Sequence, residues 1–474
     1  MTNQQNKGLN ALDLARLSLF QGCLGFLAVI FAGLLNRIMK TELGFPALLV
    51  GGGLAFEQLV SPARVVFGNI SDSWPIKGRR RTPYLLLGTF CFCFLAIVSI
   101  PIIFQTEKAL TLGSWLPITG SALALCGLFA LYGLAISMAT TPYLALVIDL
   151  TTEEERPRAI GIIWCMLTVG IIAGAIIISL TIKGIDGVKD PEILRPALQE
   201  FMIRVSIIIL LVATFSCWGI EPKQKSSDSV NEEDRYNISF GTAISMVLKD
   251  MKNAWALIRS SKQITIFFCF LSLYTLGVFC QDPILESYGG EIFGMTPARS
   301  TLLNAFWASG SLIGLLIAGL WVTPFMGKIA TARLGCKMIL CSFLLLMLAG
   351  LTGSENILFG VMVIFGLAVG IGTNSALSLM LDLTLPQVAG TFVGVWGLAQ
   401  ALSRAIGKIL GGGLLDLGEL FTGKESPLLA YWLVFSIEIL LMFLAIIVLA
   451  KLSIKGFKKD TTTNLHTLQI ADLD

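Results

Sequence analysis

Ionisable side chains are scarce inside the long apolar runs of this chain, so those that occur there are candidates for chemistry. Glu57 and Glu438 each fall near the middle of such a run. Because charge in hydrocarbon is costly, such groups are candidate functional sites. The Glu57 carboxyl group could take up a proton, bind a metal or pair with a neighbouring helix, and Glu438 could also take up a proton. Arg404 and Lys408 are one helical turn apart, and two cations on one helix face could bind a carboxylate or phosphate.

Simpler interpretations exist for several of these groups. For Glu57 the simpler interpretation is a structural ion pair. We expect Lys408 to extend outward toward Asp416 and Glu419, because long basic side chains place their charge in the polar interface. Asp282 is expected at the edge of the membrane.

Amide side chains within the apolar runs form a second set of candidates, because they can bind a polar group or bridge helices. They are Gln58, Asn36, Asn304, Asn374 and Gln400. The single histidine, His466, lies in a polar tail, and the ten cysteines lack metal-site spacing, so we predict no metal site. A nucleotide-binding glycine loop followed by lysine, an HExxH motif and a Ser-His-Asp set are all missing, so we predict no enzyme.

The elements that must position these residues are membrane-spanning helices. Hydrophobic residues make up 55% of the chain and charged residues only 14%, too few to cover a soluble protein of this length. Twelve apolar runs have roughly the 20 residues that a bilayer requires. We place them at 14–36, 45–69, 83–104, 119–148, 159–182, 201–220, 263–285, 298–322, 334–352, 355–382, 388–415 and 428–451.

The polar segments divide the chain and orient it. We predict a short N-terminus (1–13), a six-helix bundle (14–220), a linker (221–262), a second bundle (263–451) and a tail (452–474). Basic residues concentrate in the loops after every second span, so both termini are predicted to be cytoplasmic. The linker has an apolar stripe at helical spacing over 240–259, typical of a helix lying on the membrane surface. The net charge of +3 reflects this loop asymmetry and indicates no nucleic-acid partner.

The two bundles are related by an internal repeat. Asp149-Leu150-Thr151 and Asp382-Leu383-Thr384 align at one constant offset, at which glycines before and after them also match. Six spans separate the copies, so both copies run in the same direction. We therefore predict an all-α membrane protein with twelve transmembrane helices in two parallel six-helix halves, as in the major facilitator superfamily.

The loop after the second span resembles the signature of that superfamily: a glycine, an Asp four residues later, then a glycine and basic residues. Here Asp72 and Gly78 are six residues apart, where the common form has three. The resemblance implies that Asp72 pairs with a basic residue and latches one bundle to the other. Candidates for such latch or gating roles are Asp72, Arg79, Arg80, Arg81, Asp149, Arg158 and Asp382. For Arg37, at the end of the first span, the two alternatives are an acidic partner on the outer side and a position facing lipid headgroups.

Longer blocks resemble one branch of the superfamily, the PucC-type bacteriochlorophyll-delivery family. The blocks are Leu17–Gly22, Leu34–Met39 with Glu42–Ala47, Ser71-Asp72 with Arg80–Tyr84, Phe293–Thr296 with Thr301–Leu303, and Leu381–Thr384 with Val388–Phe392 and Trp396–Ala401. The resemblance implies a role in supplying chlorophyll or bacteriochlorophyll, or in assembling light-harvesting antenna proteins, in a thylakoid or intracytoplasmic membrane.

The leading hypothesis is therefore a membrane protein that delivers chlorophyll or bacteriochlorophyll to light-harvesting or photosystem apoproteins, or assists their assembly. A chlorophyll magnesium needs an axial donor, which Glu57 or one of the amide candidates could supply. The glycine-rich faces of several helices could form a flat slot for the pigment or simply allow close packing. The alternatives are a proton-coupled carrier of small solutes, and a non-transporting scaffold that binds antenna apoproteins.

Overall fold

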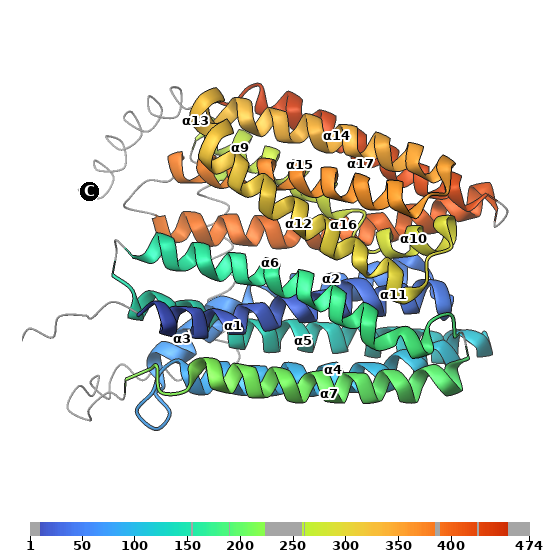
Figure 1. Cartoon of the computed structure of the whole chain (residues 1–474), viewed down its shortest axis with the longest axis horizontal. Coiled ribbons are helices and arrows are strands. Elements are labelled where there is room, and N and C mark those ends of the chain that lie inside the picture. Colours follow the sequence, from blue (N-terminus) through green and yellow to red (C-terminus); the bar gives the residue numbers. More distant parts are fainter. Residues whose placement is uncertain are drawn as a thin grey trace, which may run out of the picture. The chain divides into compact units, whose positions relative to one another are not determined.

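The computed structural model describes residues 10–152, 155–188, 190–222, 258–259, 261–383, 389–423 and 426–453. These residues are almost entirely helical (Figure 1). Ten of the described helical segments are long and apolar enough to cross a bilayer. The predicted all-α membrane fold is confirmed, and the chain is an integral membrane protein. Most of the linker with its predicted surface helix, His466 and residues 384–388 of the repeat lie outside the described residues.

The chain forms two compact units. Unit 1 consists of Met1–Val247 and Gly294–Ala305, and unit 2 of Leu248–Phe293 and Phe306–Asp474. The segment Gly294–Ala305 thus packs with unit 1, although the first helices of unit 2 precede it in the sequence.

The helices of unit 1 include one that continues through two π-helical turns. They are α1 (Ala11–Ala28) with η1 (Val29–Leu35) and η2 (Ile38–Glu42), α2 (Ala47–Leu59), α3 (Ala63–Ser73), α4 (Thr82–Leu112), α5 (Trp115–Leu150), α6 (Arg156–Thr181) with η3 (Ile182–Ile185), α7 (Pro191–Cys217) and α11 (Pro297–Ser300).

The helices of unit 2 include α12, whose first residues belong to the segment that packs with unit 1. They are α9 (Lys262–Phe279), α10 (Leu285–Phe293), α12 (Leu302–Ile317) with η5 (Ala318–Val322), α13 (Thr323–Met326), α14 (Lys328–Thr352), α15 (Glu355–Asp382), α16 (Ala389–Thr422) and α17 (Pro427–Leu449).

The same helix pairings recur in both units. In unit 1, α1 packs against α6 and α7, and α4 packs against α5 and α7. In unit 2, α9 packs against α16 and α17, and α14 packs against α15 and α17. In each unit the long hairpin, α4–α5 or α14–α15, turns at a glycine with positive φ, Gly113 or Gly353. We refer to the hairpin turns as the Gly113 end and the Gly353 end, and to the opposite ends as the Arg81 end and the Lys328 end.

Glycines at several helix crossings are in direct contact with backbone of the neighbouring helix. A Cβ at Gly170 of α6 would collide with the carbonyl oxygen of Gly22 on α1. In unit 2 a Cβ at Gly370 of α15 would collide with the carbonyl oxygen of Ser311 on α12. Small residues at such crossings allow helix backbones to approach closely in a membrane. At these positions the neighbouring helix fills the space that a flat pigment slot would need.

The predicted span at 45–69 is two helices instead of one. Regular helix ends at Leu59, and α3 begins at Ala63 after a turn held by bonds such as Ala63 N–H to the Val60 carbonyl at 3.0 Å. Pro62 causes the break, because it has no N–H to donate and its ring clashes with the preceding helical turn. Glu57 therefore lies in the last turn of a short helix.

Candidate functional site

A cluster of charges at the Arg81 end of unit 1 joins three elements. Arg81, only 9% exposed, precedes α4. Its Nη1 lies 2.6 Å from Asp72 Oδ1 on α3 and 2.8 Å from Ser71 Oγ, and its Nε lies 3.0 Å from Asp149 Oδ2 on α5. All of these residues belong to unit 1. The Asp72 pair therefore fastens α3 to α4 within one unit, and the predicted role of Asp72 in latching one bundle to the other does not describe this contact.

The loop before Arg81 explains why the spacing of its motif is longer than usual. Ile76 and Arg79 bond to each other through both backbone groups, at 2.9 and 3.1 Å. Between them Lys77 and Gly78 have φ of 53° and 75°. A two-residue turn with positive φ at both central positions matches the type that closes tight hairpins. The extra residues thus form a compact turn that returns the chain to Arg81.

Glu221 is a site residue that the sequence did not single out. Its carboxylate accepts bonds from the backbone N–H groups of Arg80, Arg81 and Thr82, at 2.7, 2.9 and 2.7 Å. Those N–H groups lie at the start of α4, where the helix leaves its donors unsatisfied and its dipole favours an anion. The signal in the sequence was weak: a single acid just before Pro222, after the last span of the first bundle.

The same end holds a cavity of about 250 Å³, lined by Gly78, Arg80, Arg81, Leu146, Asp149, Leu150, Glu221 and Pro222. Of the described residues, it is Arg81 that pairs with Asp149, whereas Arg158 is exposed on α6. Arg79 and Arg80 are partly buried in the loop.

A matching ion pair occurs in unit 2. Lys328, the first residue of α14, places its Nζ 2.6 Å from Oδ1 of Asp382, the last residue of α15. Asp149 and Asp382, which the repeat aligns, are thus each bound by a cation at the start of the preceding long helix. Both pairs are structural contacts within one unit, and a gating role for the two acids stays a prediction.

The first span ends in a buried ion pair. The guanidinium of Arg37, 3% exposed, bonds to both carboxylate oxygens of Glu42 at 3.2 to 3.4 Å and to the carbonyl of Met295 at 3.0 Å. Of the two alternatives predicted for Arg37, the structure therefore shows the one in which it pairs with an acidic residue. Asn36, fully buried between two π-helical segments, donates to the carbonyl of Ala32 at 3.0 Å.

The remaining amide candidates are spread over several elements. Asn304 donates to the carbonyl of Thr301 at 3.4 Å, within its own helix start. Asn374 donates to Thr323 Oγ1 at 3.3 Å and so bridges α15 to α13. Gln400 lies partly buried on α16. Gln58 donates to Glu57 Oε1 at 3.3 Å, and Arg64 on α3 attracts the same carboxylate.

In unit 2 the predicted position of the Lys408 side chain is wrong. Lys408 is 6% exposed and its Nζ lies 4.0 Å from Asp282 Oδ2, so it does not extend toward Asp416 and Glu419. α9 ends at Phe279, and Asp282 lies partly exposed in the turn that follows, where it meets α16. Arg404, one turn from Lys408, stacks on Phe279 with 4.4 Å between its Cζ and the ring centroid. Glu438 on α17 is fully buried.

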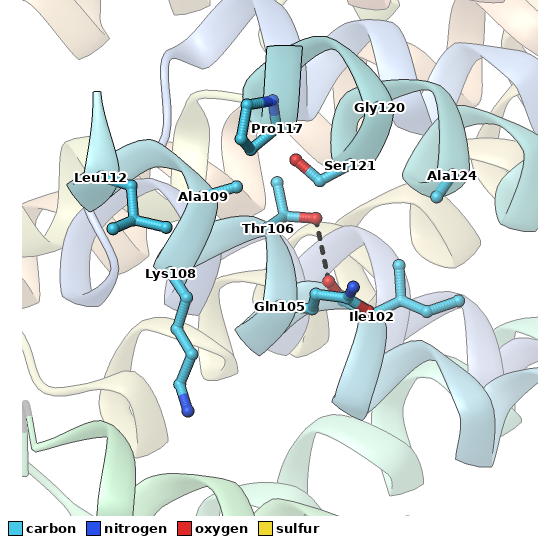
Figure 2. A pocket seen from close by; sticks show the side chains of 10 residues that line it. All are labelled: Ile102, Gln105, Thr106, Lys108, Ala109, Leu112, Pro117, Gly120, Ser121 and Ala124. Atoms are coloured by element: carbon cyan, nitrogen blue, oxygen red, sulfur yellow. Dashed lines mark hydrogen bonds between the residues drawn. The ribbon is translucent and has the colours of Figure 1, made fainter. Parts of the chain in front are cut away.

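A larger cavity, of about 400 Å³, lies at the Gly113 end of unit 1 between α4 and α5 (Figure 2). Pro117 and Ser121 of α5 face Thr106 of α4, whose hydroxyl bonds its own helix at the Ile102 carbonyl, and Lys108 extends away from the hollow. Cavities of this size accept small molecules. Its lining contains none of the candidate residues from the sequence.

Comparison with known proteins identifies the family. The family model described as PUCC protein matches residues 34–457. Protein PucC of Cereibacter sphaeroides is 28% identical, over 93% of this chain and 91% of its own length. The bacteriochlorophyll synthase 44.5 kDa chain of Rhodobacter capsulatus is also 28% identical, over 92% and 94%.

Solved structures agree on the fold. A bacterial homologue of the iron transporter ferroportin, in an inward-facing state, superposes with a TM-score of 0.65 at 13% identity, covering 94% of this chain and 99% of that one. At this identity the likeness shows the fold alone, which is that of major facilitator transporters. The match of the family model over nearly the whole chain shows that this protein belongs to the PucC family.

Proposed function

We propose that this protein delivers chlorophyll or bacteriochlorophyll to light-harvesting or photosystem apoproteins, or assists their assembly, in a photosynthetic membrane. The observation that carries the proposal is the family match over residues 34–457, together with relatives named for PucC and for bacteriochlorophyll synthesis. The concentration of basic residues in alternate loops supports cytoplasmic termini.

The residues best suited to a pigment's magnesium are Glu57 and Gln58. They lie at the break between α2 and α3 and are only partly buried, so a large ligand can reach them. Hard magnesium prefers oxygen donors such as carboxylate and amide oxygens. Asn36 is fully buried and Asn374 bridges α15 to α13, so these two amides are weaker candidates.

The test is an absorption spectrum of the protein purified gently from its native membrane, with co-purifying subunits identified in the same sample. If the protein delivers pigment, its spectrum should show a chlorophyll band in fixed ratio to the protein after antenna subunits are removed. This band should be weaker in Glu57→Leu. Glu192→Gln, which removes an exposed carboxylate at the start of α7, is the control and should keep the band. A colourless protein that retains antenna subunits would support the scaffold and contradict delivery.

A proton-coupled carrier of small solutes is the second candidate. The transporter fold and the buried Glu438 in unit 2 support it. Solute uptake into vesicles that depends on a proton gradient, with no pigment bound, would favour this function over delivery.

A further inference from the structure

A polar cluster, buried apart from one partly exposed carboxylate, lies where three helices of unit 2 meet. It consists of Gln281 and Asp282 in the turn after α9, Lys408 on α16 and Glu438 on α17, and we call it the Glu438 cluster. α9 packs against both α16 and α17, and a Cβ at Gly411, three residues after Lys408, would collide with the carbonyl of Cys280. The elements that carry the cluster are therefore held tightly together.

Glu438 is unusual because its carboxylate lacks the partners that a buried charge needs. Its side chain is 0% exposed, and neither oxygen receives a hydrogen bond of ordinary geometry from the described residues. The charge of Asp282 repels an ionised Glu438, while the backbone of Gln281 lies beside the carboxyl group without meeting the geometry of a hydrogen bond. An isolated carboxylate in such surroundings is strongly disfavoured relative to the neutral acid.

Gln281 supplies an independent observation. Its Oε1 is buried, and no donor among the described residues reaches it. An ionised carboxylate can only accept hydrogen bonds, whereas a carboxylic acid carries an O–H that donates. The cluster thus holds a buried acceptor without a donor, on a residue whose backbone lies beside the Glu438 carboxyl group, and one added proton would supply the missing donor.

Among the described residues, no basic side chain hydrogen-bonds to the Glu438 carboxyl group. Several charged or titratable residues lie on α17 or on the elements packed against it. They include Cys280 and Asp282 after α9, Arg404 and Lys408 on α16, Glu286, Tyr288 and Glu291 on α10, Cys336 on α14 and Tyr431 on α17. Arg404 stacks on Phe279, Tyr431 donates to Glu291 at 3.0 Å, and Lys408 lies beside Asp282. With both acids ionised the cluster carries two negative charges and one positive charge.

We propose that the Glu438 cluster is a binding site for one proton, held on the Glu438 carboxyl group, while Asp282 and Lys408 remain a neutral ion pair. A proton suits the site better than a metal ion for two reasons. The positive charge of Lys408 already balances the negative charge of Asp282, and metal ions require several oxygen ligands. The proposal does not depend on the pigment role, since it concerns the charge balance inside unit 2.

Infrared difference spectroscopy of the full-length protein in lipid nanodiscs at neutral pH tests the proposal. A protonated carboxyl group has a carbonyl stretch that is distinct from carboxylate bands and shifts in D₂O. We expect one such band, lost completely in Glu438→Gln and unchanged in the control Glu192→Gln. Absence of the band, its survival in Glu438→Gln, or its loss in Glu286→Gln instead would overturn the assignment.

Substitutions of Lys408 test whether its positive charge keeps Asp282 ionised. Lys408→Met removes the cation beside Asp282, so a second band should appear as Asp282 also takes a proton. Lys408→Arg keeps the cation and should leave a single band. An undoubled band in Lys408→Met would contradict the charge balance, and loss of the wild-type band on adding NaCl at fixed pH would show a metal-cation site instead.

Discussion

Lys328 Nζ lies 2.6 Å from Asp382 Oδ1, joining the start of α14 to the end of α15. Arg81 joins the start of α4 to the end of α5 through Asp149 in the same way, at 3.0 Å. The two acids are aligned by the repeat, but the cations are not aligned at the same offset and differ in type. The shared feature is thus a bond between the two helices of each hairpin at the end opposite its turn.

Arg81 should contribute more to stability than an ordinary surface cation, because it bonds two acids and a hydroxyl while itself being buried. We expect Arg81→Gln to lower the free energy of unfolding by about 1–2 kcal/mol; the loss is limited because both acids are half-exposed. Thermal unfolding in detergent measures this. Arg204→Gln, which removes an exposed pair with Glu200, is the control and should change stability by less than about 0.5 kcal/mol. Equal effects would contradict the special role of Arg81.

Glu221 should hold the start of α4 in place. Glu221→Ala removes the acceptor for three backbone N–H groups, and we expect a loss of about 1–2 kcal/mol together with faster amide exchange over residues 80–82. Hydrogen exchange read by mass spectrometry detects the local effect. Asp190→Ala removes a cap that accepts one bond, from the N–H of Glu192, and should have the smaller effect. Unchanged exchange at the start of α4 would argue against the cap.

Two glycines on α6 offer a matched comparison. Gly170→Ala places a methyl group against the Gly22 backbone, which must move, and we expect a cost of about 1–3 kcal/mol. A Cβ at Gly161 meets nothing within 4 Å, so Gly161→Ala should be neutral or stabilise by up to about 1 kcal/mol. Thermal unfolding of both variants tests this expectation. Equal changes in unfolding temperature would mean that α1 and α6 do not pack this closely.

Arg37 and Glu42 should be strongly coupled, because both are buried. Arg37→Met removes the cation that is bonded to the buried Glu42 carboxylate, and we expect a loss of about 3–5 kcal/mol. Adding Glu42→Gln removes the buried negative charge as well and should restore much of that loss. A double-mutant cycle of unfolding free energies measures the coupling. Additive single effects would show that the two side chains do not interact.

The sequence by itself determined the class of protein, most helix positions and the family. Span length and apolar composition are local properties, so the helix at 355–382 coincides with α15. The repeat singled out Asp149 and Asp382, because duplicated halves keep such residues at equal spacing. The family blocks around Asn36, Asp72 and Trp396 indicated PucC, which the family model confirms.

Only the tertiary structure decided which charges meet. Lys408 lies beside Asp282, Arg37 beside Glu42 and Glu221 at the start of α4. The sequence could not supply the Lys408 and Glu221 contacts, because each joins residues more than a hundred positions apart. Hydropathy also missed the interruption at Pro62, since the run remains apolar on both sides of it. Partner choice in a membrane bundle depends on helix rotation and crossing, and these are set by packing among all the helices at once.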